Sequence, residues 1–90
     1  MINRIIKSEH KIWIHARPAA MIAGLASKFD SVVMLMADER IADAKDVTAV
    51  LNLFPRGTEE VELLTEGSDE TQAADKIEEL FLTFQETDTK

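Results

Sequence analysis

The residues best suited to chemistry in this chain gather in one short stretch, Ile14-His15-Ala16-Arg17-Pro18-Ala19. His15 carries a ring nitrogen that can act as a nucleophile, and Arg17 carries a guanidinium that can bind two phosphoryl oxygens at once. Pro18 is favoured in the first helical turn, so we expect the stretch to lie where a strand gives way to a helix. This pattern suits covalent phosphoryl transfer, in which a protein mainly positions the group and neutralises its charge.

The start of the predicted helix adds to this candidate site. Its first backbone N–H groups have no partner within the helix and carry a partial positive charge, so an anion is expected to bind beside Ala16, Arg17 and Pro18. The same charge disfavours the imidazolium form of His15, which keeps the ring neutral and nucleophilic at about pH 7. The alternative is an ordinary exposed histidine near a helix start.

Composition limits what else the chain can be. It has 90 residues, a net charge of −7 and no cysteine, with 46% hydrophobic and 30% charged residues. These values are typical of one small folded domain spanning residues 1–90, and the lack of cysteine excludes a disulfide framework and a thiolate metal site. Because no apolar run resembles a signal peptide or could span a bilayer, we expect a cytoplasmic protein without membrane insertion.

Charge is unevenly distributed along the chain. Residues 1–28 hold five basic residues and one acidic residue, whereas residues 29–90 hold five basic and sixteen acidic residues. An acidic chain is poorly suited to nucleic acid, so we expect no such partner. The basic first quarter is either ordinary surface charge or a surface that attracts an anion or an acidic partner. His10 and His15 lack further ligands for an evident metal site, and we expect neither a metal nor a cofactor.

The spacing of apolar residues predicts the order βαββαβα, and thus an α+β fold with an antiparallel sheet and its helices on one face. The predicted strands are Ile2–Lys7, Ser31–Met36, Arg40–Ala44 and Val61–Thr65. The predicted helices begin near Arg17-Pro18, Asp46 and Asp69.

Several residues within these elements carry specific expectations. Met21 is expected to face inward with its apolar neighbours. Gly24 costs about 1 kcal/mol relative to alanine inside a helix, so we expect it to mark close packing. Asp69 and Gln72 resemble a capping box, and residues 85–90 form a polar tail expected to fray.

The segment IHARPA, at this position in a chain of this length, resembles the phosphorylation-site motif of the HPr family of the phosphoenolpyruvate-dependent phosphotransferase system. The resemblance extends over nearly the whole chain, through ASKFDSVVMLM, AKDVTAVLNL and GTEEVELLTEGSDETQAADKIEELF. It implies an open-faced β-sandwich of four antiparallel strands with three helices on one face.

The resemblance also implies a carrier rather than an enzyme. His15 would accept a phosphoryl group from enzyme I on its Nδ1 atom and pass it to a IIA domain of a sugar permease or to a nitrogen-branch equivalent, while Arg17 steadies the group. Partners would dock on an apolar surface of the first two helices. That surface would use Ala20, Val47, Thr48 and Leu51, and the carrier would act as a monomer.

Three departures from the family pattern bear on function. Trp13 replaces a usual glycine beside the active-site turn, where it is either a core residue or a partner contact. Thr48 replaces a larger apolar residue and is expected to weaken docking. Asp46 stands where many relatives carry a regulatory serine, so it is either a plain helix N-cap or a fixed regulatory charge. The alternative function is a regulatory binding module on the same fold with weakened phosphotransfer.

Overall fold

Seven elements follow the predicted order βαββαβα. In this computed structural model the backbone is described over residues 1–12, 16–37, 39–53 and 58–87, and side chains over residues 1–7, 17–37, 39–53 and 60–83. The strands are β1 (Ile2–Ile12), β2 (Val32–Ala37), β3 (Arg40–Asp43) and β4 (Thr58–Glu66). The helices are α1 (Ala16–Ala26), α2 (Val47–Leu51) and α3 (Glu70–Thr87).

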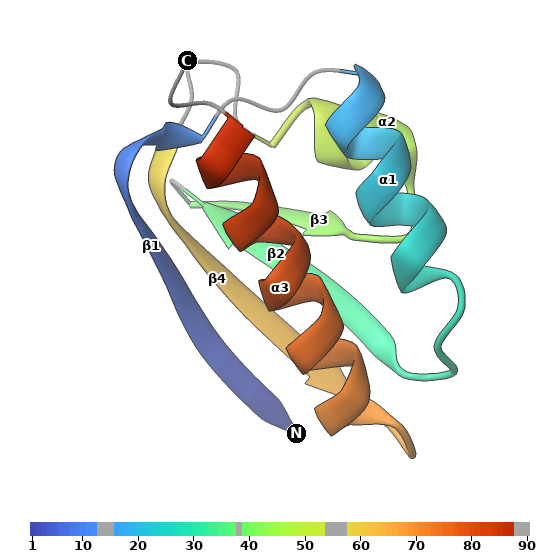
Figure 1. The fold of residues 1–90 in the computed structure, drawn as a ribbon. Helices are drawn as coiled ribbons and strands as arrows, with labels where there is room; N and C mark the ends of the chain where they lie inside the picture. Colours follow the sequence, from blue (N-terminus) through green and yellow to red (C-terminus); the bar gives the residue numbers. More distant parts are fainter. Residues whose placement is uncertain (13–15, 38, 54–57, 88–90) are drawn as a thin grey trace.

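The four strands form one antiparallel sheet in the order β1-β4-β2-β3 (Figure 1). β4 is therefore the strand that joins β1 to the β2–β3 hairpin. Its alternation fixes the two faces of the sheet, because Val61, Leu63 and Thr65 are buried whereas Glu60 and Glu66 are exposed. Glu62 lies opposite Ile5 of β1 and Met36 of β2.

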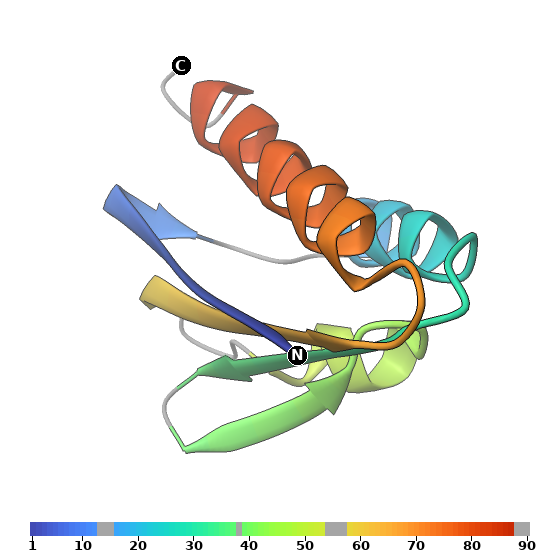
Figure 2. The same cartoon turned by 90° about the horizontal axis from the view of Figure 1, so that it is seen from below.

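The helices α1 and α3 cover one face of the sheet and leave the other face open (Figures 1 and 2). The short helix α2 contacts α1 and β3. The core between the layers is apolar, and buried side chains of all four strands and of the helices contribute to it. Its fully buried members include Ile22, Leu35, Leu63, Ile77 and Phe81. The predicted four-stranded antiparallel sheet with three helices is thus confirmed.

The first strand is longer than the predicted Ile2–Lys7. It continues to Ile12, and its pairing with β4 shifts in register between Lys7 and Ile12. Such an irregularity interrupts the alternation by which a strand is recognised in a sequence. That is why the second half of β1 was not predicted.

The outer side of α1 differs from expectation at two positions. Met21 is 44% exposed and does not face the core. A Cβ added to Gly24 would meet nothing within 4 Å, so the prediction that this glycine marks close packing is wrong. Both residues are exposed on the outer side of α1. The helix therefore carries more apolar residues than those that pack against the core.

The start of α3 is held by a different bond from the predicted capping box. The Asp69 carboxylate accepts the backbone N–H groups of Asp30 and Ser31, each at 3.0 Å, and the hydroxyl of Ser31 as well. We expected this carboxylate to cap α3. It instead accepts hydrogen bonds from residues just before β2, and so links the start of α3 to the start of β2. Within the described part of the chain, no helix is long and apolar enough to cross a membrane.

Candidate functional site

The predicted site lies at the N-terminal end of α1. The helix begins at Ala16, so Pro18 stands in its first turn, where a missing N–H costs no helical hydrogen bond. His15 and Trp13 lie outside the described residues. The helix therefore begins immediately after His15 in the chain, and its first N–H groups and positive dipole end belong to the residues that follow this histidine.

The core contact of α1 decides which of its side chains reach solvent. Ala19 and Ile22 are fully buried, which fixes the rotation of the helix. Arg17 and Ala20 are consequently exposed. The Arg17 guanidinium is thus available at the first turn of the helix, two residues after His15.

The second helix begins with a cap supplied by Asp46. Its Oδ1 atom accepts the backbone N–H groups of Thr48 at 3.0 Å and of Ala49 at 3.3 Å. This bonding confirms the predicted N-cap, while a regulatory role of the exposed carboxylate stays a prediction. Val47 and Thr48 are exposed, and Leu51 is half-buried against the core.

α1 and α2 lie side by side (Figure 1), and the connections around them are tied together. The Lys45 ammonium, just before α2, donates to the Phe29 carbonyl after α1 at 2.9 Å. The exposed residues of the two contacting helices therefore lie on adjacent parts of the surface. We call these residues together the α1–α2 surface, which consists of Arg17, Ala20, Met21, Val47 and Thr48, with Leu51 at its margin.

Met21 is the member of this surface that the sequence did not indicate. Its neighbours in the apolar spacing face the core, so periodicity grouped it with them. The spacing held no signal that separates Met21 from Ile22, because adjacent residues of one helix can both be buried, as Ile22 and Ala23 are.

The basic first quarter of the chain does not act as one patch. Nη1 of Arg4 lies 2.6 Å from Asp75 Oδ1 and 2.9 Å from Glu78 Oε1, both on α3. The hydrogen bonds to Asp75 and then Glu78 hold the pKa of Arg4 above its ordinary value. Arg4 therefore serves the contact between β1 and α3, whereas Arg17 and Lys28 are exposed on and just after α1.

Comparison with known proteins agrees with this geometry. The family model "PTS HPr component phosphorylation site" matches residues 3–83. The Phosphocarrier protein HPr of Treponema pallidum is 38% identical over 81 residues, which cover 90% of this chain and 92% of that protein. The chain belongs to the HPr family. Its place there makes it a phosphocarrier protein of the phosphotransferase system rather than a catalytic enzyme.

Two further members of the HPr family show how far the similarity extends. The HPr-like protein Crh of Bacillus subtilis is 31% identical over 77 residues, covering 86% of this chain and 91% of that protein. The crystal structure of HPr-C-His from Thermoanaerobacter tengcongensis matches with a TM-score of 0.83 and 30% identity, over 96% of this chain and 97% of that one. The open-faced α+β sandwich is therefore the HPr fold.

Proposed function

We propose that this HPr-family chain accepts a phosphoryl group on His15 from enzyme I and passes it to a IIA domain, in the cytoplasm. The observation that carries the proposal is the placement of exposed Arg17 in the first turn of α1, directly after His15 in a chain that the HPr model matches over residues 3–83. In the first transfer a bond forms from phosphorus to a ring nitrogen of His15 as the bond from phosphorus to the donor breaks. In the second transfer a bond forms from phosphorus to the acceptor as the bond to the His15 nitrogen breaks.

The residues after His15 have separate tasks in this proposal. The first N–H groups of α1, from Ala16 onward, offer donors and a partial positive charge to the phosphoryl oxygens, and Pro18 fixes the turn. Arg17 neutralises developing charge on the oxygens through its planar guanidinium. Because Arg17 is exposed, its side chain can reach the phosphoryl oxygens without any change in the core.

The α1–α2 surface supports the proposed docking of both partners. Val47 is 38% exposed and Met21 is 44% exposed, although both are apolar. When a partner covers this exposed apolar area of α1 and α2, it would exclude water around the transferred group. Ala20, Val47, Thr48 and Leu51 would thus contact the partner while His15 and Arg17 handle the phosphoryl group.

The test is incubation with phosphoenolpyruvate and enzyme I, followed by intact-mass measurement. We expect one phosphoryl group that is labile in acid and stable in base, and none on His15→Ala. His10→Ala is the matched control and should be labelled like the parent chain. Labelling that persists in His15→Ala would contradict the assignment of His15.

The second candidate function is a regulatory binding module with weakened phosphotransfer, and Asp46 is the residue that favours it. Its carboxylate is exposed and places a permanent negative charge at the start of α2. The same incubation separates the two candidates. A chain that binds enzyme I but stays unlabelled would support the regulatory module.

A further inference from the structure

The face of the sheet that no helix covers has an unusual composition. Ile41 is 67% exposed, Val32 is 56% exposed and Ile5 is 52% exposed, and all three point to this open face. Met34, Met36 and Leu64 lie between them and are half-buried. These six apolar side chains, which we call the open-face band, lie on neighbouring strands of one face, and exposed apolar side chains grouped in this way commonly mark a binding surface.

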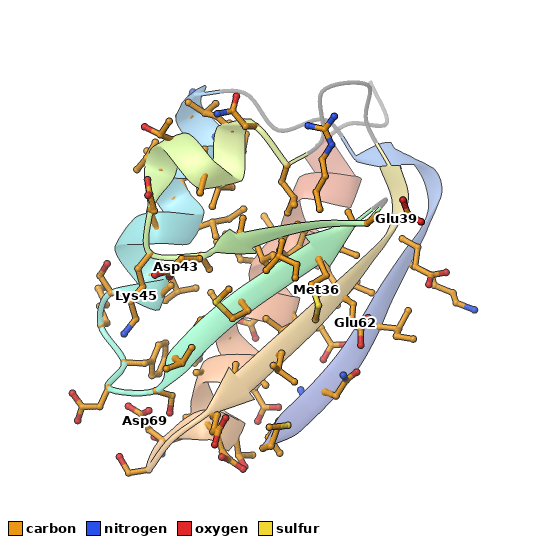
Figure 3. All side chains as sticks on the ribbon, turned by 180° about the vertical axis from the view of Figure 1, so that it is seen from behind. Met36, Glu39, Asp43, Lys45, Glu62 and Asp69 are labelled. Atoms are coloured by element: carbon orange, nitrogen blue, oxygen red, sulfur yellow. The ribbon has the colours of Figure 1, made fainter. Side chains whose placement is uncertain are left out.

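Strand register arranges the band in rows, and in one of them Glu62 stands between Ile5 and Met36. Ile5 lies opposite Glu62, Glu62 lies opposite Met36, and Met36 lies opposite Ile41, so one row of side chains crosses all four strands. Figure 3 shows Met36 and Glu62 next to each other on this face. In the next row Leu64 of β4 lies opposite Met34 of β2. Residues that lie directly opposite each other on neighbouring strands point to the same face of the sheet, so the side chains of both rows lie on the open face.

Carboxylates accompany the band. The described side chains on this face and at the turn between β2 and β3 include five acids against two cations. The acids are Glu39, Asp43, Glu60, Glu62 and Glu66, and the cations are Lys7 on the face and Arg40 at the turn. Lys7 lies opposite Glu60 in the register. The open face thus carries both apolar and acidic side chains. The apolar ones are not needed there for the core of this chain, because the core lies on the other side of the sheet.

A depression of about 530 Å³ brings the two properties to one place. Met36 and Ile41 line it with Glu39, Glu60 and Glu62, and Figure 3 shows Glu39 above Met36 and Glu62. Arg40 also borders it, but its guanidinium donates to the Asn52 carbonyl at 3.2 Å. The depression suits a lysine or arginine whose methylene stem packs on aliphatic side chains while its charged end meets carboxylates.

We propose that the open face is a second docking surface, and that its occupant is an amphipathic helix of another protein whose apolar stripe is flanked by lysine and arginine. Apolar residues of that helix would cover the open-face band, and its cations would meet Glu39, Glu60 and Glu62. A helix fits better than a strand because strands add at sheet edges, whereas a helix laid on the open face completes a third layer.

The charge of the chain argues against a second copy as the occupant. Two open faces brought together would oppose like carboxylates, in a molecule whose net charge is already −7. Like charges in apposition disfavour association. A cationic partner gains from the same carboxylates.

The proposed surface is separate from the phosphotransfer site. α1 lies on the opposite side of the sheet from the open face (Figure 2), whereas α2 contacts the edge strand β3. Binding here would leave the start of α1 free, so a partner could hold the carrier while it exchanges phosphoryl groups. The inference therefore does not depend on which residue is phosphorylated.

The test uses the whole chain labelled with ¹⁵N and a synthetic amphipathic peptide of about 18 residues, long enough for a stable apolar stripe, with leucines on that stripe and lysines on its flanks. We expect amide shifts confined to the four strands and binding that weakens as salt rises. A peptide with glutamate in place of lysine should not bind. Equal binding of both peptides, shifts confined to α1 and α2, or no shifts at all would overturn the proposal.

Two variants locate the surface. Ile41→Thr keeps a β-branched residue on the edge strand but removes apolar contact, and should weaken peptide binding by roughly threefold to tenfold. Val47→Thr makes the same kind of change on the α1–α2 surface and should leave peptide binding unchanged. Thermal unfolding checks that both variants are folded. Sedimentation of the chain alone supplies the other outcome, because a dimer abolished by Ile41→Thr would assign the open face to a second copy.

Discussion

The Asp69 carboxylate at the start of α3 binds Ser31 at the start of β2 twice, through the backbone N–H at 3.0 Å and through the hydroxyl. Ser31 is 1% exposed, so its hydroxyl would be a buried polar group without this partner. Gly67, in the connection before α3, lies against the same serine. One carboxylate thus holds the β4–α3 connection against the start of β2.

The first prediction concerns pH and Asp69. Its hydrogen bond from the Ser31 hydroxyl, and then that from the Asp30 N–H, lower the pKa of Asp69 below its ordinary value. Since the folded pKa is the lower one, the stabilisation is present above the unfolded value of about 3.9 and is lost as pH falls through the folded value. Asp69→Asn should therefore unfold at a lower temperature than the parent chain at neutral pH, with the difference shrinking as pH falls below about 4. Thermal unfolding across pH measures this.

A control for Asp69 lies on the same helix. Glu79 is exposed, and Glu79→Gln changes one charge there without touching Ser31. We expect its unfolding temperature to follow the parent chain at every pH. If Asp69→Asn also runs parallel to the parent chain, the carboxylate contributes no pH-dependent stability.

The second prediction contrasts two glycines. Gly24→Ala should raise the free energy of unfolding by about 1 kcal/mol, because alanine is the better helix former and the added methyl group meets nothing. Gly67→Ala should lower it, since Gly67 has φ +152° and the added carbon would lie 2.6 Å from Ser31 Cα. Denaturant unfolding of both variants gives the two signs. A loss of stability in Gly24→Ala would show that the outer side of α1 is packed after all.

The third prediction concerns Arg17. Replacing this exposed residue with glutamate reverses the charge beside His15, and should slow phosphoryl transfer by about 100-fold or more, in the range found for groups that stabilise transition-state charge. The unfolding transition should be nearly unchanged. Lys28→Glu makes the same reversal just after α1 and should slow transfer far less. Rapid-quench measurement of transfer from enzyme I compares the two, and equal effects would point to general attraction rather than a role at the phosphoryl group.

The fourth prediction concerns Asp46. Asp46→Ser keeps a good N-cap and removes the charge, so it should speed association with enzyme I at low salt, with the difference fading as salt rises. Asp46→Ala removes both, and should also cost about 1 kcal/mol of stability. Transfer rates measured across salt concentrations separate charge from capping. Equal rates for the parent chain and Asp46→Ser at every salt concentration would make Asp46 a helix cap only.

The sequence predicted those features that each segment specifies on its own. Alternation in β4 marked Val61, Leu63 and Thr65 as buried, and Asp46 capped the helix that follows it. The features that were missed depend on distant residues or on an irregularity. Asp69 finds Ser31 from 38 positions away, and β1 continues past a shift in register that periodicity cannot follow.

The candidate site was predicted more fully in its chemistry than in its surroundings. Pro18 and the apolar spacing placed the start of α1, and the structure has that start at Ala16. The exposure of Met21 was not predicted. The spacing of apolar residues shows which side of a helix faces the core, but it does not show how many of the residues near that side are buried. The structural positions of His15 and Trp13 lie outside the described residues, and their roles stay predictions.

The position of β4 between β1 and β2 also sets the order in which this chain can fold during synthesis. β1 emerges first from the ribosome, but its partner β4 does not begin until Thr58. Until then β1 and the β2–β3 hairpin have no strand between them, and the apolar side of each is uncovered. The sheet is therefore completed by pairing between residues far apart in the chain, which favours slower folding than local contacts alone would allow.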